Sequence, residues 1–173
     1  MKAIFQTGYG SPNFFELRNI DKPGIKDNDV LIKVHSTSLH AGDIYFMRGV
    51  PKMVRLIAGF PKPKKYIPGF DLSGQVEKVG KKVTKFQPGD EVFGSGRSTL
   101  AEYVCAKEKN LILMPHNLNL EQAAAIPTSA LSALQGLRDI GKVQPGYKVL
   151  INGASGGVGT FAVQIAKAHL VLK

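Results

Sequence analysis

The sequence predicts a mainly β domain, a small barrel or sandwich, followed by the beginning of an α/β domain. Three observations support this fold class: short alternating segments separated by Gly and Pro, a change to helix-forming residues near position 120, and a glycine-rich turn between an apolar run and a helical pattern. The chain has 173 residues, 43% of them apolar and 21% charged, which is typical of a folded globular protein. A chain of this length can hold one domain and part of a second.

The first domain consists of short segments in which apolar and polar residues alternate, which is the pattern of half-buried strands. These segments are residues 2–6, 29–37, 74–80, 91–94 and 100–106. Gly and Pro residues lie between them, as in the turn at Pro88 and Gly89. Short strands at this spacing are typical of a small barrel or sandwich.

Two helices are expected where the composition changes. Residues 120–126 are good helix formers and end before Pro127, because the residue that precedes a proline leaves the helical region. A second helix is expected from Thr128 to Asp139, with leucines at every third position on one face and Gly141 as its stop. We therefore predict residues 1–125 as the first domain and residues 126–173 as the second.

The second domain contains a glycine-rich turn between a strand pattern and a helix pattern. Residues 149–151 are an apolar run that suits a buried parallel strand, and apolar residues recur at helical spacing over residues 161–166. This order predicts the dinucleotide-binding fingerprint of a Rossmann domain, because N–H groups at the helix start and the helix dipole hold a pyrophosphate. The residues of the turn are Ala154, Ser155, Gly156, Gly157, Val158 and Gly159.

Three glycine patterns compete for this turn. Ala154, Gly156 and Gly159 fit the Rossmann spacing with Ala in first place. The spacing from Gly153 equally fits the variant of short-chain dehydrogenases, but that variant normally opens a chain, whereas most of this chain precedes it. A P-loop is excluded because Thr160 follows Gly159 with no lysine between them.

The composition of the chain indicates in which cellular compartment the protein is found and which kinds of partner it binds. No run of about 18 apolar residues exists that could span a membrane, and no secretory leader is recognisable. Cys105 is the single cysteine, which excludes an internal disulfide and favours a cytoplasmic location. Many of the lysines and arginines that give the net charge of +10 lie in residues 52–65 and 78–85. No nucleic-acid-binding motif accompanies them. We interpret them as a solvated loop face, with attraction of a phosphorylated cofactor or polyanion as the alternative, and expect neither nucleic acid nor membrane as a partner.

Five blocks of sequence, taken in order, resemble one family: residues 68–80, 86–94, 100–104, 123–127 and 148–167. They are similar to the medium-chain dehydrogenase/reductase superfamily, most closely to its zinc-independent quinone oxidoreductase branch, the zeta-crystallin-like enzymes. The resemblance implies a GroES-like β domain with the substrate contacts and a Rossmann domain that binds NADP(H) in the cleft between them, with NAD(H) not excluded. The reaction that it implies is hydride transfer to a small-molecule quinone or enone.

The same comparison of residues predicts that no zinc is bound. Zinc alcohol dehydrogenases of this superfamily carry a Gly-His-Glu trio, and the matching residues here are Gly69, Phe70 and Asp71. The upstream segment 38–43 has no thiol, and the four cysteines of the structural zinc lobe are absent, whereas tetrahedral zinc needs nitrogen and sulfur ligands. The histidines do not share a metal-ligand spacing and are interpreted as solvent or core residues.

The resemblance also implies three candidate catalytic residues in the segment that lines the cleft. Tyr45 would donate a hydrogen bond to a substrate oxygen, because a phenol with a pKa of about 10 keeps its proton at neutral pH. Asp43 would orient Tyr45 or His40, and His40, which replaces the usual Asn of the branch, would titrate near neutral pH if it lines the cleft. The alternatives are half-buried aromatic packing for Tyr45, an exposed carboxylate or helix cap for Asp43, and neutral packing for His40.

Thr128 matches the position that approaches the nicotinamide in this branch, so it joins the glycine turn as a cofactor-binding candidate, with a plain helix N-cap as the alternative. The residue that reads the cofactor ribose is expected about 20 residues beyond the glycines, which is past the last residue. We therefore expect an oxidoreductase whose isolated chain is inactive. The alternatives are a non-catalytic β module that binds a partner or forms a homo-oligomer through its incomplete Rossmann edge, and an RNA-binding protein driven by the basic loops.

Overall fold

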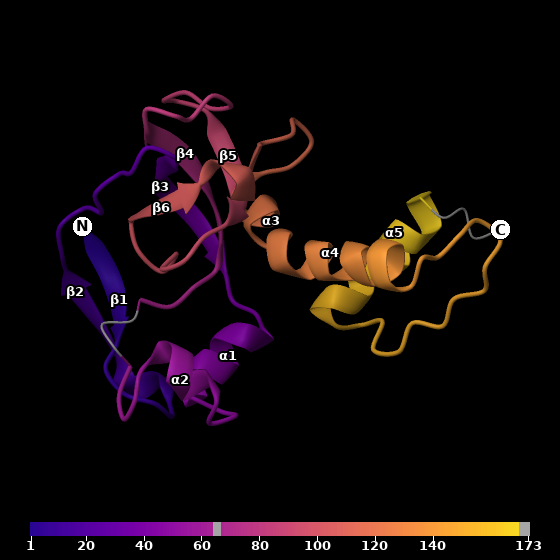
Figure 1. Ribbon diagram of the computed structural model, residues 1–173, viewed down its shortest axis with the longest axis horizontal. Helices are drawn as coiled ribbons and strands as arrows, with labels where there is room; N and C mark the ends of the chain where they lie inside the picture. Colours follow the sequence, from indigo (N-terminus) through magenta and orange to yellow (C-terminus); the bar gives the residue numbers. More distant parts are fainter. Residues whose placement is uncertain (64–66, 170–173) are drawn as a thin grey trace. The chain divides into compact units, whose positions relative to one another are not determined.

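The computed structural model describes residues 1–63 and 67–169. Its internal contacts divide the chain into two compact units, Met1–Ala125 and Ile126–Lys173, which we call unit 1 and unit 2 (Figure 1). Unit 1 contains every strand of the described residues, and the described part of unit 2 contains helices and loops. Lys64 and Lys65 of the first basic stretch lie outside the described residues.

Unit 1 is built from two antiparallel sheets, which confirms the prediction of a mainly β domain. The smaller sheet pairs β1 (Lys2–Gln6) with β2 (Phe15–Asn19). The larger sheet has five strands in the order β6-β3-β4-β5-β7, and β6 and β7 are its edges, so the described strands do not close into the barrel that the sequence suggested. The bounds of these strands are Asp29–Ser38 for β3, Asp71–Val79 for β4, Glu91–Ser95 for β5, Tyr103–Lys107 for β6 and Leu111–Leu113 for β7.

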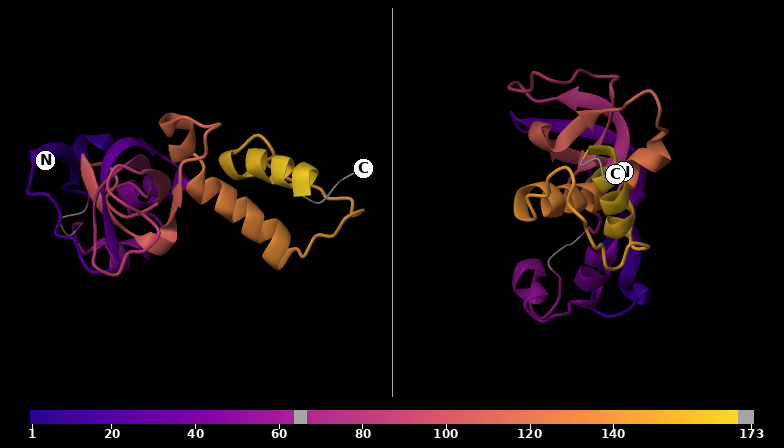
Figure 2. Two further views of the ribbon diagram at one scale, coloured as in Figure 1. Left: turned by 90° about the horizontal axis from the view of Figure 1, so that it is seen from above. Right: turned by 90° about the vertical axis from the view of Figure 1, so that its right-hand side faces the viewer.

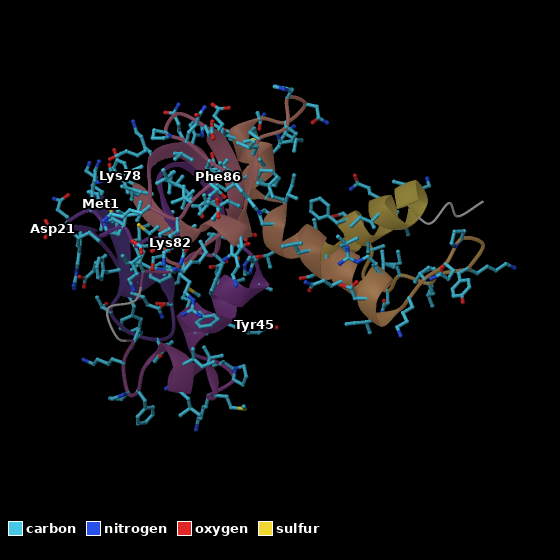
Figure 3. The ribbon with its side chains drawn as sticks, turned by 45° about the horizontal axis from the view of Figure 1, so that its top comes forward. Met1, Asp21, Tyr45, Lys78, Lys82 and Phe86 are labelled. Carbon is cyan, nitrogen blue, oxygen red and sulfur yellow. The ribbon has the colours of Figure 1, made fainter. Side chains whose placement is uncertain are left out.

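The core of unit 1 consists of apolar side chains from the five-stranded sheet. Ile32 of β3 and Leu72 of β4 are fully buried, and Val92 of β5 packs in the same cluster. Phe86, from the connection between β4 and β5, lies against them inside unit 1 (Figure 3). The apolar positions of the alternating segments therefore face one common interior, as the period of two predicts.

The second basic stretch lies on the solvated surface of unit 1. Lys78 of β4 and Lys82 of the following turn are both exposed (labelled in Figure 3). The Lys82 ammonium is 3.7 Å from the carboxylate of Asp27, and both side chains are open to solvent. An ion pair of this kind contributes little to stability, so these lysines behave as a solvated face.

Four regular elements of unit 1 were not predicted from the sequence. The strand β2 exposes four of its five residues and β7 has only three, so neither shows a readable alternation. Between β3 and β4 lie the helices α1 (Ala41–Arg48) and α2 (Val54–Ala58), and the only buried residue of α1 is an acidic one. α1 has no apolar stripe and α2 has only five residues, so neither helix gives a periodic signal that could be detected. Two short 3-10 turns, Pro12–Phe14 and Glu108–Asn110, complete the unit.

On the side away from β2, β1 forms backbone hydrogen bonds with the segment that precedes β6. The Ile4 amide donates to the Leu100 carbonyl at 2.9 Å, and the Glu102 amide donates to the Lys2 carbonyl at 3.0 Å. Ala3 is fully buried and forms an isolated bridge with Ala101. β1 therefore has a partner on both sides, although one partner lies about a hundred residues away in the sequence.

A capped helix covers the five-stranded sheet at the end of unit 1. This helix, α3 (Leu120–Ala124), confirms the helix that was predicted at residues 120–126. Asn119 accepts a hydrogen bond from the Gln122 amide at 2.7 Å, and the Gln122 side chain accepts one from the Asn119 amide at 3.2 Å. The Ser73 hydroxyl of β4 donates to the Leu120 carbonyl and fastens the helix to the sheet.

The described part of unit 2 contains two helical segments that pack against each other (Figure 2). The first, α4 (Pro127–Leu134), continues as the π-helical turn η3 (Gln135–Ile140), which confirms the second predicted helix and its stop at Gly141. The second, α5 (Gly157–His169), confirms the helix that was predicted after the glycine turn. Small and aliphatic side chains make the contact: Ala133, Leu137, Ala162 and Ala166 are its buried members.

The strand predicted at residues 149–151 is wrong, because no strand forms there. Val149 and Ile151 pack against the core of unit 2, whereas Leu150 between them is 95% exposed. The alternation of an extended segment is thus present. A parallel strand also needs a neighbouring strand for its hydrogen bonds, and the described part of unit 2 contains none.

The buried sheet positions predict a large difference between two leucine substitutions. Leu72→Ala removes a fully buried side chain from β4, so the free energy of unfolding is expected to fall by about 2–5 kcal/mol. Leu17→Ala is the matched control, because Leu17 is 67% exposed on β2 and its change is expected to stay within about 0.5 kcal/mol. Urea unfolding followed by far-UV circular dichroism measures both values. Equal losses in the two variants would contradict the assignment of the core.

Candidate functional site

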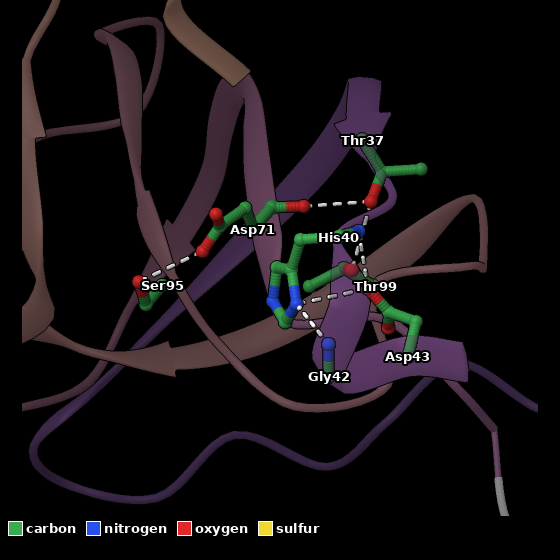
Figure 4. A network of polar contacts seen from close by, with 7 residues as sticks. All are labelled: Thr37, His40, Gly42, Asp43, Asp71, Ser95 and Thr99. Carbon is green, nitrogen blue, oxygen red and sulfur yellow. Dashed lines mark hydrogen bonds and ion pairs between the residues drawn. The ribbon is translucent and has the colours of Figure 1, made fainter. Parts of the chain in front are cut away.

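The N-terminus of α1 is fixed by a reciprocal pair of side chains, His40 and Asp43 (Figure 4). His40 is the N-cap residue, and its Nδ1 accepts a hydrogen bond from the Gly42 amide at 3.0 Å. The Asp43 carboxylate reaches back and accepts a hydrogen bond from the His40 amide at 2.9 Å. A histidine thus takes the place of the Ser or Thr of an ordinary capping box, and both residues serve the helix start.

The capping contact also fixes the proton arrangement of the neutral His40 ring. Because Nδ1 accepts from an N–H group, the ring proton lies on Nε2. Nδ1 and the Asp43 carboxylate are 3.5 Å apart, and both are acceptors in this state. Within the described part of the chain, Nε2 of His40 and Oδ1 of Asp43 are buried and have no hydrogen-bond partner. A buried donor and a buried acceptor at this helix end are therefore without partners within the described residues.

One aromatic ring stacks on His40, and a second ring contacts the first. The Phe70 ring stacks against the imidazole with centroids 5.5 Å apart and an angle of 25° between the planes. Phe46 of α1 contacts the same Phe70 ring at 5.3 Å. Phe70 lies between Gly69 and Asp71 in the sequence. Its ring has no atom that could bind a metal ion, so it presents an apolar surface to His40.

A buried polar network lies behind this aromatic cluster (Figure 4). The Thr37 hydroxyl of β3 donates to the Asp71 carbonyl at 2.6 Å and lies 2.9 Å from the Thr99 hydroxyl. The Ser95 hydroxyl of β5 donates to the Asp71 carboxylate at 3.1 Å, and Asp71 and Thr99 are almost completely buried. These bonds join β3, β4 and the segment after β5, and thereby hold the backbone that carries Phe70.

The C-terminus of α1 is held by Gln6, a residue that sequence reasoning treated only as part of a strand. Its side-chain amide donates to the carbonyls of Gly8 and Met47 at 2.9 Å and to that of Phe46 at 3.4 Å. Gly49 ends the helix in the left-handed conformation, with φ of 60°. A polar residue at the end of a strand with three consecutive apolar residues was the available signal, but its partners in α1 lie about 40 residues away in the sequence.

The third catalytic candidate, Tyr45, lies on the opposite side of α1 from Asp43. Successive residues of an α-helix are about 100° apart, so positions 43 and 45 point in different directions. Asp43 is buried, whereas Tyr45 is 55% exposed and projects from unit 1 in Figure 3. Its hydroxyl makes no hydrogen bond within the described residues. The structure therefore brings His40 and Asp43 together and presents Tyr45 as a separate donor; Asp43 does not orient it.

The cofactor-binding candidates form a compact turn at the start of α5. Gly153 has φ of 72°, and its carbonyl accepts a hydrogen bond from the Gly156 amide at 3.0 Å. Gly159 packs so closely on this turn that a Cβ there would overlap the Gly153 carbonyl oxygen and lie 2.7 Å from the Ala154 Cα. This is the close approach of helix and turn for which the last glycine of a dinucleotide fingerprint is required.

The outer side of the turn is open, as a pyrophosphate site requires. Gly156 and Gly157 are exposed, and a Cβ on Gly156 would meet only the Gly153 carbonyl, at 3.4 Å. The first N–H groups of α5, at Gly157 and Val158, have no intrahelical partner because of their position. The residues of the turn therefore fit a dinucleotide, with backbone donors and the positive end of a 13-residue helix directed at one place.

Thr128 lies in the first turn of α4, where Pro127 is the first helical residue and Ile126 is the N-cap. The N-cap alternative for Thr128 is therefore wrong. Its carbonyl accepts a hydrogen bond from the Ser132 hydroxyl at 2.7 Å. The neighbouring Ser129 faces the glycine turn, because a Cβ on Gly157 would lie 3.2 Å from its Oγ. Sequence reasoning did not identify Ser129 as part of this site.

The single thiol of the chain lies apart from the α1 cluster, on β6. Burial, the largest effect, and the neighbouring Asp29 raise the pKa of Cys105, so it stays protonated at neutral pH. Its Sγ lies 3.7 Å from the Gly24 carbonyl. Within residues 1–63 and 67–169, no three His, Cys, Asp or Glu side chains gather in a way that could hold a metal ion.

Comparison with known proteins places the chain in a family. The model of the alcohol dehydrogenase GroES-like domain matches residues 26–116. A quinone oxidoreductase of Sus scrofa is 39% identical over 98% of this chain and 50% of its own length. An NADPH-dependent alkenal/one oxidoreductase of Arabidopsis thaliana is 34% identical over 96% of this chain and 44% of its own length.

Structural comparison agrees with these matches. The quinone oxidoreductase of Coxiella burnetii superimposes with a TM-score of 0.83 at 34% identity, over 96% of this chain and 53% of that one. The chain spans about half the length of the curated relatives that it matches. Its sequence and its fold together show that the chain belongs to the alcohol dehydrogenase GroES-like domain family, within the medium-chain dehydrogenase/reductase superfamily.

Proposed function

We propose that the protein belongs to an NADP(H)-dependent oxidoreductase that transfers a hydride to a quinone or enone without zinc. The observation that carries this proposal is the glycine turn, in which Gly159 packs against Gly153 and leaves the N-terminus of α5 open. The names of the relatives from Sus scrofa and Arabidopsis thaliana support the acceptor class and NADPH. NAD(H) stays a second candidate, since the residue that reads the ribose is expected beyond the glycine turn.

The cofactor is proposed to lie with its pyrophosphate on the turn from Ala154 to Gly159. Backbone N–H groups of Gly157 and Val158 would donate to the phosphate oxygens, and Ser155 is exposed beside them. Thr128 is proposed to lie along the same cofactor, next to Ser129, which faces the turn. When bound, the cofactor supplies the hydride, and the chain supplies the position and the local field.

The acceptor is proposed to bind at α1 of unit 1. Tyr45 would donate its phenolic proton in a hydrogen bond to the acceptor oxygen as negative charge develops there. His40 is proposed to act with Asp43 in positioning α1, because its Nδ1 accepts from the Gly42 amide and its Nε2 is buried. Asp43 acts as a positioning residue through the His40 amide. Phe70 supplies an apolar surface beside His40 where zinc alcohol dehydrogenases carry a histidine, and this supports chemistry without zinc.

A second candidate function, self-association, is favoured by the apolar side chains that unit 2 exposes. Leu150 and Ile140 are almost fully exposed, and Val158 and Leu131 are about half exposed. Isolated apolar side chains are common on surfaces, but several in one small unit favour association. A monodisperse monomer on a calibrated sizing column would contradict a homo-oligomer formed through unit 2.

Activity is expected only when the nucleotide-binding domain is completed. The 173-residue chain should show no turnover, whereas a protein that carries a full second half should oxidise NADPH with a naphthoquinone or an α,β-unsaturated ketone. NADPH absorbance with each acceptor measures this, with and without added zinc chelator. The absence of turnover in the completed protein would contradict the proposed function. Comparable turnover by the 173-residue chain would contradict its expected inactivity.

Removal of the Tyr45 hydroxyl tests the acceptor site. Tyr45→Phe is expected to lower kcat/KM of the completed protein about 10²-fold, because a donor to the developing oxyanion is lost. Tyr147→Phe is the matched control, since Tyr147 is 54% exposed and Tyr45 is 55% exposed, and it should leave the rate unchanged. Steady-state kinetics with saturating NADPH measure the effect. An unchanged kcat/KM for Tyr45→Phe would contradict the proposal that Tyr45 donates a hydrogen bond to the acceptor.

A methyl group at Gly159 tests the cofactor turn. Gly159→Ala forces the helix away from Gly153 and Ala154, and overpacking of this kind costs about 1–3 kcal/mol, so NADPH affinity should fall at least about tenfold. Gly136→Ala is the control, because nothing lies within 4 Å of its Cβ position. NADPH fluorescence titration of the completed protein measures both. Equal affinities in the two variants would contradict the placement of the pyrophosphate.

A further inference from the structure

The helix α2 carries an apolar surface that faces outward. Its side chains belong to Met53, Leu56, Ile57 and Phe60, which are 73%, 81%, 79% and 73% exposed. We call these four residues the α2 surface. Leu56 and Ile57 lie in α2, Met53 is its N-cap residue, and Phe60 follows its C-cap residue Gly59. Large apolar side chains are mostly buried in globular proteins, whereas these four are exposed to solvent.

The outward orientation is fixed by contacts on the inner side of α2. The Tyr9 hydroxyl donates to the Gly59 carbonyl at 2.6 Å. Arg55 donates to the Gly49 carbonyl at 3.0 Å, and its guanidinium lies 4.8 Å from the centre of the Tyr9 ring. Ala58 is buried on the same side. The segment is therefore anchored by its polar groups and small residues, which leaves its large apolar groups outside.

The charge around the α2 surface has one sign. No Asp or Glu occurs between Asp43 and Asp71. The described cations of this stretch are Arg48, Lys52, Arg55 and Lys62, and within the described residues none of them pairs with a carboxylate. Arg48, Lys52 and Lys62 are exposed. Large apolar side chains thus lie in a stretch of the chain that contains several cations and no carboxylate.

We propose that the α2 surface binds the surface of an anionic lipid bilayer. The apolar side chains would enter the boundary between headgroups and acyl chains, and the cations would contact the lipid phosphates, which is how basic amphipathic segments attach to membranes. A nucleic acid would call for stacking aromatics, and the α2 surface offers only Phe60. Among the described residues, no helix has the length and hydropathy of a membrane span. This proposal replaces the sequence-based expectation of no membrane partner.

Vesicle sedimentation tests the attachment without any cofactor, so its result is independent of the proposed enzymatic function. The 173-residue chain is expected to sediment with vesicles of phosphatidylcholine and phosphatidylglycerol and to stay in solution with phosphatidylcholine alone. Raising the salt concentration should weaken binding, because screening reduces the attraction of the cations. Binding that is equal on both vesicle types, or absent from both, would overturn the proposal.

Substitutions distinguish insertion of the α2 surface into the bilayer from attraction by the general positive charge of the chain. The double variant Leu56→Ser, Ile57→Ser is expected to lower the partition coefficient at least about tenfold, since two apolar side chains no longer insert. Leu17→Ser, at another exposed leucine, should leave it unchanged. Lys52→Gln and Lys62→Gln should each lower it about fivefold. Far-UV circular dichroism confirms that each variant is folded.

Two outcomes of these substitutions would contradict the proposal. Binding that survives Leu56→Ser, Ile57→Ser and responds only to salt would show attraction of a basic protein without insertion. A dimer of the unmodified chain that the same double variant converts to a monomer, seen by sedimentation velocity without lipid, would assign the α2 surface to a second copy of the chain instead.

Discussion

The arrangement of unit 1 around its candidate site depends on hydrogen bonds at the two ends of α1. A helix of eight residues is too short to be stable in isolation, and α1 buries only Asp43, so packing of an apolar face cannot hold it. His40 and Asp43 satisfy its first N–H groups, and Gln6 and Gly49 satisfy its last carbonyls. The direction in which Tyr45 points follows from these end contacts. The outward face of α2 follows from a similar anchor, at Tyr9 and Arg55.

The two candidate sites would bind their ligands through different kinds of group, backbone in one and side chains in the other. The glycine turn of unit 2 uses backbone, because a pyrophosphate is held by N–H groups and a side chain at Gly159 would separate helix and turn. The α1 cluster of unit 1 uses side chains on a rigid base, which consists of Thr37, Asp71 and Thr99. A backbone site tolerates little variation at its glycines. A side-chain site can change its chemistry by single replacements, as at His40 and Phe70.

Much of the fold could be predicted because its signals are local. Alternation identified β3 and β4, and helical spacing identified α5. The strand at residues 149–151 was predicted wrongly, because an apolar run does not reveal whether a neighbouring strand is present. At the site, the resemblance to the family suggested His40, Asp43 and Tyr45. Their relation could not be read from the sequence: whether Asp43 faces His40 or Tyr45 depends on where α1 begins, and the role of Gln6 depends on a contact 40 residues away.

The closure of β1 by residues 100–102 has a consequence for the order of folding. β1 and β2 can pair as soon as the first 19 residues are present, but the bonds of Lys2 and Ile4 require Glu102 and Leu100. During synthesis, one side of the first strand stays open until most of unit 1 has been made. Contacts between such distant residues slow folding, since a long loop must close before they form. Until then the open edge of β1 presents unpaired backbone groups, which can pair with another chain.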